Sequence, residues 1–172
     1  MKIIRILFLC TILLTWSCQS HKQPEIFGGL KLGIPSDEFM ELVKSNKQLS
    51  NCTGGRVYCY HMGNNIKGEF IASSEANHVV FAELSFNALQ GWELEYIKRI
   101  FFEKYPINKF NSRWVEADGF RGTVYRNENF NNMSIIIDEQ INSFKVTWTL
   151  ITEGDIREKE EKNKFERDKK NF

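Results

Sequence analysis

The sequence lacks an excess of charge of either sign. Its 23 basic and 22 acidic residues give a formal net charge of +1, and without residues 1–17, which contain Lys2 and Arg5, 21 basic residues stand against 22 acidic ones. A chain with this balance has no general electrostatic attraction for nucleic acid and no basic cluster for anionic lipid. We therefore expect no nucleic-acid partner.

The common motifs of catalytic and cofactor sites are also missing. The chain contains no G-x-S-x-G or S-x-x-K nucleophile motif, and the stretch CTGGRVY lacks the G-K-[ST] ending of a phosphate loop. His21, His61 and His78 form none of the paired metal-binding motifs. We predict no catalytic residue, no metal site and no cofactor. An enzyme or ligand site built from residues far apart in the sequence stays open as an alternative.

No hydrophobic run reaches the length of a membrane-spanning helix. As a helix, Ile3–Leu14 would rise ~18 Å, whereas the hydrocarbon core of a bilayer is ~30 Å thick. Lys2 and Arg5 begin this run, and the small residues and cysteine of TWSC follow it. This order is typical of an export signal.

The stretch L-T-W-S-C, which ends at Cys18, resembles the lipobox of bacterial lipoproteins. The resemblance implies that Cys18 receives a diacylglyceryl group and that signal peptidase II cleaves before it. Gln19 after the cysteine then implies sorting to the outer membrane, with the protein facing the periplasm. Residues 1–17 would be the signal peptide and 18–25 a polar tether. The alternative is an ordinary secretory signal, with Cys18 lost or left free.

Residues 26–152 are predicted to form a single α+β domain, an antiparallel sheet with helices packed on one face. Ser36 is the expected N-cap of a first helix, and a second helix is expected over 91–106. The predicted order is helix, three strands, helix, three strands. The strands are expected in a hairpin within residues 51–65 and over 68–73, 78–86, 121–126, 132–138 and 143–151.

The composition changes at residues 153–172, where acids and bases alternate with few apolar residues. Four acid–base pairs lie four positions apart with the acid first, an arrangement that stabilises a helix by roughly 0.2–0.5 kcal/mol for each pair. We predict a charged, solvated C-terminal helix or a disordered tail. A partner-binding helix is the alternative.

Two cysteines lie in the body of the chain, Cys52 and Cys59. They flank the Gly54–Gly55 turn of the predicted hairpin, and export would place them where disulfides persist. The spacing is not C-x-x-C, and only His61 lies near as a further metal ligand. We predict a structural disulfide, with two reduced cysteines as the main alternative.

The segment NSRWVEADGFRG, read as a loop, carries the candidate interaction surface: Arg113, Trp114, Phe120 and Arg121. Exposed Trp and Arg side chains are typical anchors of protein interfaces. The alternative is that Trp114 and Phe120 close the core after the second helix.

These features together predict a lipid-anchored cell-envelope protein, a non-catalytic binding or assembly module with a protein partner. The alternatives are an exported enzyme or small-ligand-binding protein, and an inhibitor or immunity-type protein. An exposed aromatic patch around Trp114 would favour the binding module, whereas a deep apolar cleft with converging polar groups would favour an enzyme or ligand binder.

Overall fold

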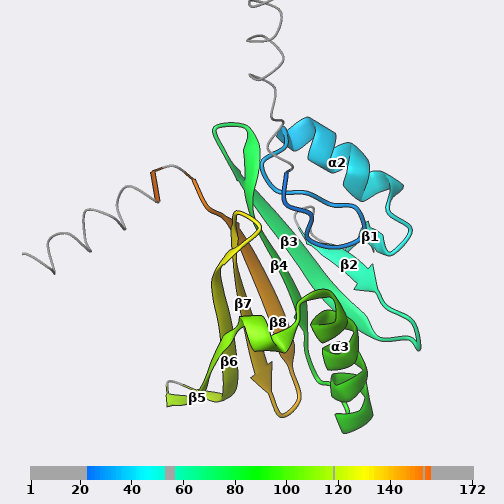
Figure 1. Ribbon diagram of the computed structural model, residues 1–172. Helices are drawn as coiled ribbons and strands as arrows, with labels where there is room; N and C mark the ends of the chain where they lie inside the picture. The colour runs from blue at the N-terminus through cyan, green and yellow to red at the C-terminus, as the bar shows by residue number, and fades with distance from the viewer. Residues whose placement is uncertain (1–22, 53–56, 118, 153, 156–172) are drawn as a thin grey trace, which may run out of the picture.

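The computed structural model describes residues 23–52, 57–117, 119–152 and 154–155. Their main element is one eight-stranded antiparallel sheet of order β1-β2-β3-β4-β8-β7-β6-β5 (Figure 1). The strands are β1 (Leu49–Asn51), β2 (Tyr58–His61), β3 (Lys67–Glu75), β4 (His78–Phe86), β5 (Asn111–Ala117), β6 (Phe120–Phe130), β7 (Met133–Gln140) and β8 (Phe144–Leu150).

The prediction of an α+β fold is wrong, because the protein is largely β. The described residues contain eight strands rather than six, and only two α-helices, α2 (Ser36–Ser45) and α3 (Gly91–Lys104), of 10 and 14 residues. The missed strands are β1, which has three residues, and β5, most of whose residues are exposed. Neither shows the apolar alternation from which strands are recognised. The predicted charged C-terminal helix falls almost wholly outside the described residues.

The apolar side chains of the central strands gather on one face of the sheet. Ala82, Leu84 and Phe86 of β4 alternate with partly exposed residues, and they lie opposite Trp148, Val146 and Phe144 of β8. All six are fully buried. Because side chains of a strand alternate between its two faces, this register brings the two apolar sets onto the same side.

Both helices pack on this apolar face. The ring centroid of Phe39 in α2 lies 6.3 Å from that of Phe70 in β3, and Phe101 in α3 lies 5.4 Å from Phe144 in β8. The predicted N-cap is wrong, because Pro35 occupies that position and Ser36 begins the helix without a side-chain cap bond. Helix α3 begins at a reciprocal capping box between Gln90 and Glu93.

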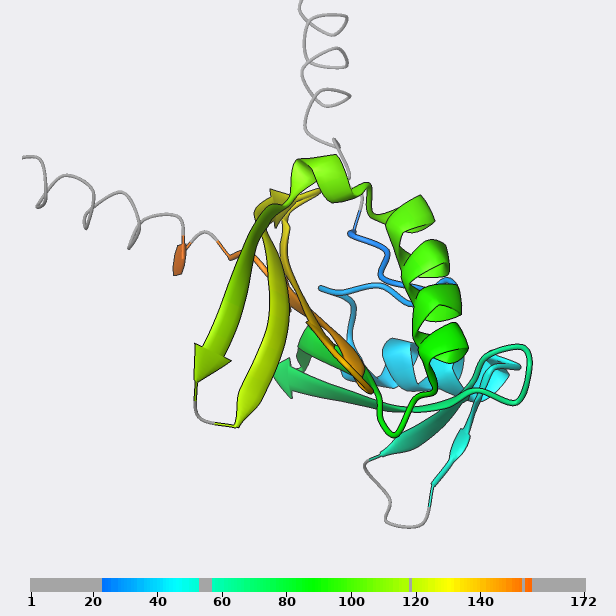
Figure 2. The ribbon, with the colours of Figure 1, turned by 90° about the horizontal axis from the view of Figure 1, so that it is seen from below.

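The segment before α2 fills the centre of the core, although it is neither helix nor strand. Its apolar residues Ile26, Phe27, Leu30, Leu32 and Ile34 are all buried. Figure 2 shows the sheet curving around this segment, with α3 on its other side. Backbone hydrogen bonds between residues 33–34 and Val79 fix it to β4. The segment therefore belongs to the domain as fully as any strand does.

The predicted disulfide is confirmed. Cys52 and Cys59 are bonded, with their Cα atoms 5.3 Å apart, across the hairpin formed by β1 and β2. Loop-closure entropy suggests a stabilisation of about 2.5 kcal/mol for so short a loop. The bond holds β1, which is too short to pair stably without help, against β2.

Candidate functional site

The segment read as a loop is a β-hairpin made by β5 and β6. Ala117 lies opposite Phe120 at the turn, and Trp114 lies opposite Thr123 along the ladder. Arg113, Trp114, Phe120 and Arg121, the four residues of the predicted interaction surface, are thus all on this hairpin. Arg121 is ion-paired with Glu116 across it, at an N–O distance of 3.7 Å.

Trp114 is the most exposed tryptophan among the described residues and does not close the core. Its exposed fraction is 59 %, whereas Trp148 on β8 is fully buried. Phe120 is partly buried next to the turn. Tryptophan is enriched among the side chains that dominate protein interfaces, so Trp114 is a candidate contact residue of the hairpin.

A polar network fixes the base of the hairpin to α3. The Tyr125 hydroxyl on β6 donates to Glu139 on β7 at 2.9 Å, and Glu139 is ion-paired with Lys98 of α3 at 2.8 Å. The ring of Tyr125 also packs edge-on against Phe102 of α3, with centroids 5.3 Å apart. Burial and the Glu139 carboxylate raise the pKa of Tyr125, so it remains a donor. The hairpin is therefore held in one orientation at its base.

The face of the hairpin opposite Trp114 carries a shallow groove of about 290 Å³. It is lined by Asn111, Ser112, Arg113, Val115, Val124 and Arg126. Register places Arg113 opposite Val124 and Arg126 opposite Asn111, so the two guanidinium groups are diagonal neighbours on one face. Within the described residues, neither arginine has an ion-pair partner.

The acidic residue that lies beside these arginines on the neighbouring strand β7 is already ion-paired. Asp138 of β7 lies opposite Val124, and its carboxylate is ion-paired with Lys145 at 3.5 Å. The groove therefore presents two positive charges and an amide above a floor of two valines. Arg126, Val124 and Asn111 were not recognised from the sequence, because only the β5–β6 register brings them beside Arg113.

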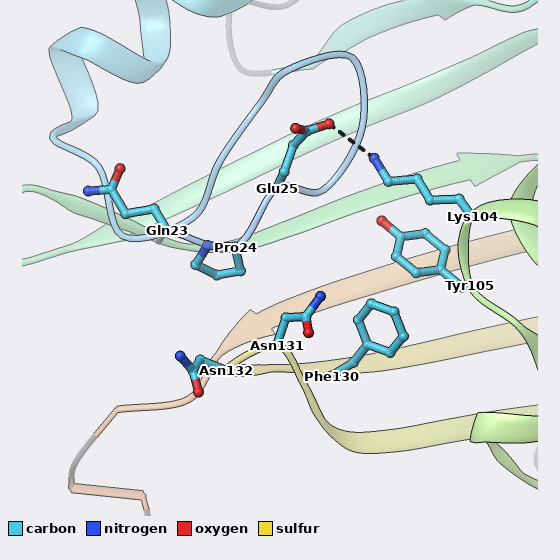
Figure 3. Close-up of a pocket in the computed structure, with 8 residues that line it drawn as sticks. All are labelled: Gln23, Pro24, Glu25, Lys104, Tyr105, Phe130, Asn131 and Asn132. Atoms are coloured by element: carbon cyan, nitrogen blue, oxygen red, sulfur yellow. Dashed lines mark hydrogen bonds and ion pairs between the residues drawn. The ribbon is translucent and has the colours of Figure 1, made fainter. Parts of the chain in front are cut away.

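A second hollow surrounds the point where the described chain begins (Figure 3). Its volume is about 780 Å³, and it is lined by Gln23, Pro24, Glu25, Lys104, Tyr105, Phe130, Asn131 and Asn132. These residues come from the N-terminal segment, the end of α3 and the turn between β6 and β7. Lys104 and Glu25 are ion-paired at its rim, at 3.3 Å.

The hydroxyl of Tyr105, which lines this hollow, already makes two hydrogen bonds within the core. It donates to the carbonyl oxygen of Ile26 and accepts from Nε1 of Trp148 at 3.0 Å. Burial raises the pKa of this phenol far above its usual range. Tyr105, Lys104 and Glu25 are thus already bonded, and the other polar side chains that line the hollow are the uncharged amides of Gln23, Asn131 and Asn132.

Two further predictions concern metals and the membrane. The part of the chain that the structure describes contains no group of three or more His, Cys, Asp or Glu side chains that could hold a metal ion. No helix within it combines the length and the apolar character needed to cross a membrane. Cys18, the predicted lipidation site, lies outside the described residues.

Comparison with known proteins gives no relative: no family, no curated protein and no solved structure matches this chain.

Proposed function

We propose that this protein is a lipid-anchored bacterial envelope lipoprotein, held at the outer membrane through Cys18, whose β domain binds a protein partner through the β5–β6 hairpin. The proposal of a protein partner rests on the exposed Trp114. This residue follows Arg113, which has no ion-pair partner within the described residues, on a hairpin whose base is fixed to α3. The anchor part is supported by the resemblance of residues 14–18 to a lipobox.

The geometry suits a domain that is tethered to the membrane at one end and binds its partner at the other end. Only five Cα steps separate Cys18 from Gln23, so an anchored Cys18 would keep Gln23 within ~17 Å of the lipid surface. Gln23 lies beside the β6–β7 turn, at one end of the 11-residue strand β6, and the hairpin turn is at the other end, roughly 35 Å away. In Figures 1 and 2 the hairpin likewise extends away from the start of the described chain.

A small-ligand-binding function at the hollow beside Gln23 is the second candidate, and its volume of about 780 Å³ is the observation that favours it. We rank it lower because Tyr105, Lys104 and Glu25 are already bonded, and the remaining polar side chains of its lining, Gln23, Asn131 and Asn132, carry no charge. An inhibitor or immunity-type protein would use the same hairpin surface and differs only in the identity of the partner.

The anchor is tested by replacing Cys18 with alanine in the producing cell. We expect Cys18→Ala to abolish labelling by a radioactive or alkyne-bearing fatty acid and to leave an uncleaved precursor, because the thiol is the acceptor of the diacylglyceryl group. Cys10→Ala, which changes the other cysteine of the leader, should leave labelling and processing intact. Unchanged labelling of Cys18→Ala would rule out the anchor.

The partner surface is tested by site-specific crosslinking in the same cells. A photoreactive benzoyl-phenylalanine in place of Trp114 should give a discrete crosslinked adduct with another protein, since this side chain would lie inside the interface. The same amino acid in place of Trp92, which is 53 % exposed on α3, is the matched control and should give none. Equal adducts at both positions, or none at either, would contradict a partner at the hairpin.

A further inference from the structure

We propose that the free edge of β5 accepts an extended acidic segment of the partner protein as an added ninth strand of the sheet. This inference rests on the proposed function, since it names the class of partner and the mode of binding at the same hairpin. It follows from three features of the described residues: a sheet edge without a pairing strand, different side chains on the two faces along that edge, and two arginines without an ion-pair partner.

The first feature is the edge itself. Within the part of the chain that the structure describes, β5 is the last strand of the sheet, it has seven residues, and it pairs only with β6. Such an edge presents a row of backbone N–H and C=O groups that another strand can bind. The opposite edge strand, β1, has only three residues and is tied to β2 by the disulfide. Of the two edges, β5 is therefore the one long enough to bind a peptide.

The second feature is the alternation of side chains along this edge. Arg113 and Val115 point to one face of the sheet, and Ser112, Trp114 and Glu116 point to the other. Side chains of an added strand alternate in the same way. One set would meet the guanidinium of Arg113, while the other set would meet the ring of Trp114. A segment that alternates acidic and apolar residues matches both faces.

The third feature is the charge. Arg113 has Arg126 as its diagonal neighbour in the groove of about 290 Å³, and neither is ion-paired within the described residues. On that face Asp138 is engaged by Lys145, and Glu116 on the other face is engaged by Arg121. A carboxylate of the added strand would supply the missing counter-charge, and a guanidinium binds a carboxylate through two parallel hydrogen bonds.

The edge is also preorganised. The bonds from Tyr125 through Glu139 to Lys98 hold β6 against α3, and β6 in turn holds β5 through seven residue pairs. On binding, only the added strand would become ordered, because β5 is already fixed, and this reduces the entropic cost of binding.

The test uses the isotope-labelled full chain in detergent micelles and a seven-residue probe peptide of alternating valine and glutamate. We expect the peptide to shift the backbone amide signals of residues 111–117 and to leave those of α2 unchanged. The same peptide with lysine in place of glutamate should bind at least about tenfold more weakly, because it cannot form charged hydrogen bonds to Arg113, and a tenfold change corresponds to about 1.4 kcal/mol. A copy N-methylated at every amide keeps the charge and should lose binding, because it cannot join the sheet.

A charge reversal in the protein gives the matching experiment. Arg113→Glu should invert the preference, so that the lysine peptide binds better than the glutamate peptide. Arg99→Glu, which reverses an exposed arginine on α3, should leave the preference unchanged. If a variant does not fold, the glutamate and lysine peptides can still be compared on the unmodified chain, and that comparison tests the inference by itself.

Four results would overturn the inference. Equal binding of the glutamate and lysine peptides would remove the acidic preference, and equal binding of the N-methylated copy would show surface attraction without strand addition. Peptide-independent, concentration-dependent shifts of the β5 amides would show that a second copy of this chain takes the edge. If position 114 crosslinks to a partner in cells while the glutamate peptide fails to bind, the proposed function stands and only strand addition fails; if neither occurs, the proposed function fails as well.

Discussion

Replacing Phe27 with alanine should lower the free energy of unfolding by about 3–5 kcal/mol, the usual cost of removing a buried phenylalanine side chain. Phe27 is 7 % exposed, and its ring lies 5.1 Å from Tyr60, 5.1 Å from Phe70 and 5.6 Å from Trp148, between ring centroids. These three partners belong to β2, β3 and β8. A single side chain of the N-terminal segment thus joins three strands of the curved sheet, and its loss leaves a cavity among them.

Trp114→Ala is the matched control, since it removes another large aromatic side chain. Trp114 is 59 % exposed, so its removal should change the free energy of unfolding by no more than about 0.5 kcal/mol. Equilibrium urea denaturation of both variants measures the difference. A loss below about 1 kcal/mol for Phe27→Ala, where 3–5 is usual for such a site, would show that the segment before α2 is not an integral part of the core.

Replacing Tyr105 with phenylalanine should destabilise the domain by about 2–4 kcal/mol although only one oxygen is removed. The variant leaves Nε1 of Trp148 and the carbonyl oxygen of Ile26 buried without their partner, and each unsatisfied group costs about 1–3 kcal/mol. Tyr125→Phe is the control, because Glu139 keeps its bond to Lys98 when the Tyr125 hydroxyl is lost. Its cost should be about 1 kcal/mol or less, the net worth of one hydrogen bond. Equal costs for the two variants, again from urea denaturation, would contradict the role of this buried network.

The same variant should change the response to alkaline pH. Burial keeps Tyr105 protonated in the folded protein at a pH where an unfolded tyrosine, with a pKa of about 10, has lost its proton. Above about pH 10 the unfolded state therefore binds fewer protons than the folded state, and stability falls as the pH rises. The pKa values of Tyr60 and Tyr125 are raised as well, so Tyr105→Phe should reduce the alkaline slope without abolishing it. A slope equal to that of the unmodified protein would exclude Tyr105 as a contributor.

Local patterns in the sequence determined several parts of this protein. The strand predicted over residues 78–86 matches β4, and the strand predicted over 143–151 matches β8 within one residue at each end. The second predicted helix began at the observed residue 91. The Cys52–Cys59 bond was also recognisable. In each case the signal is local, because apolar spacing reports a half-buried strand or helix, and a short hairpin brings its flanking cysteines together.

Tertiary structure alone decided the rest. The fold class was mistaken because β5 lies at an edge with both faces largely in solvent, and a strand without a buried face has no apolar alternation to reveal it. The sequence left open whether Trp114 closes the core or faces solvent, since burial depends on what the sheet and α3 cover. Arg113 and Arg126 are 13 positions apart and meet only through the β5–β6 register. The proposed binding edge is a product of long-range pairing, and long-range pairing has no counterpart in local sequence.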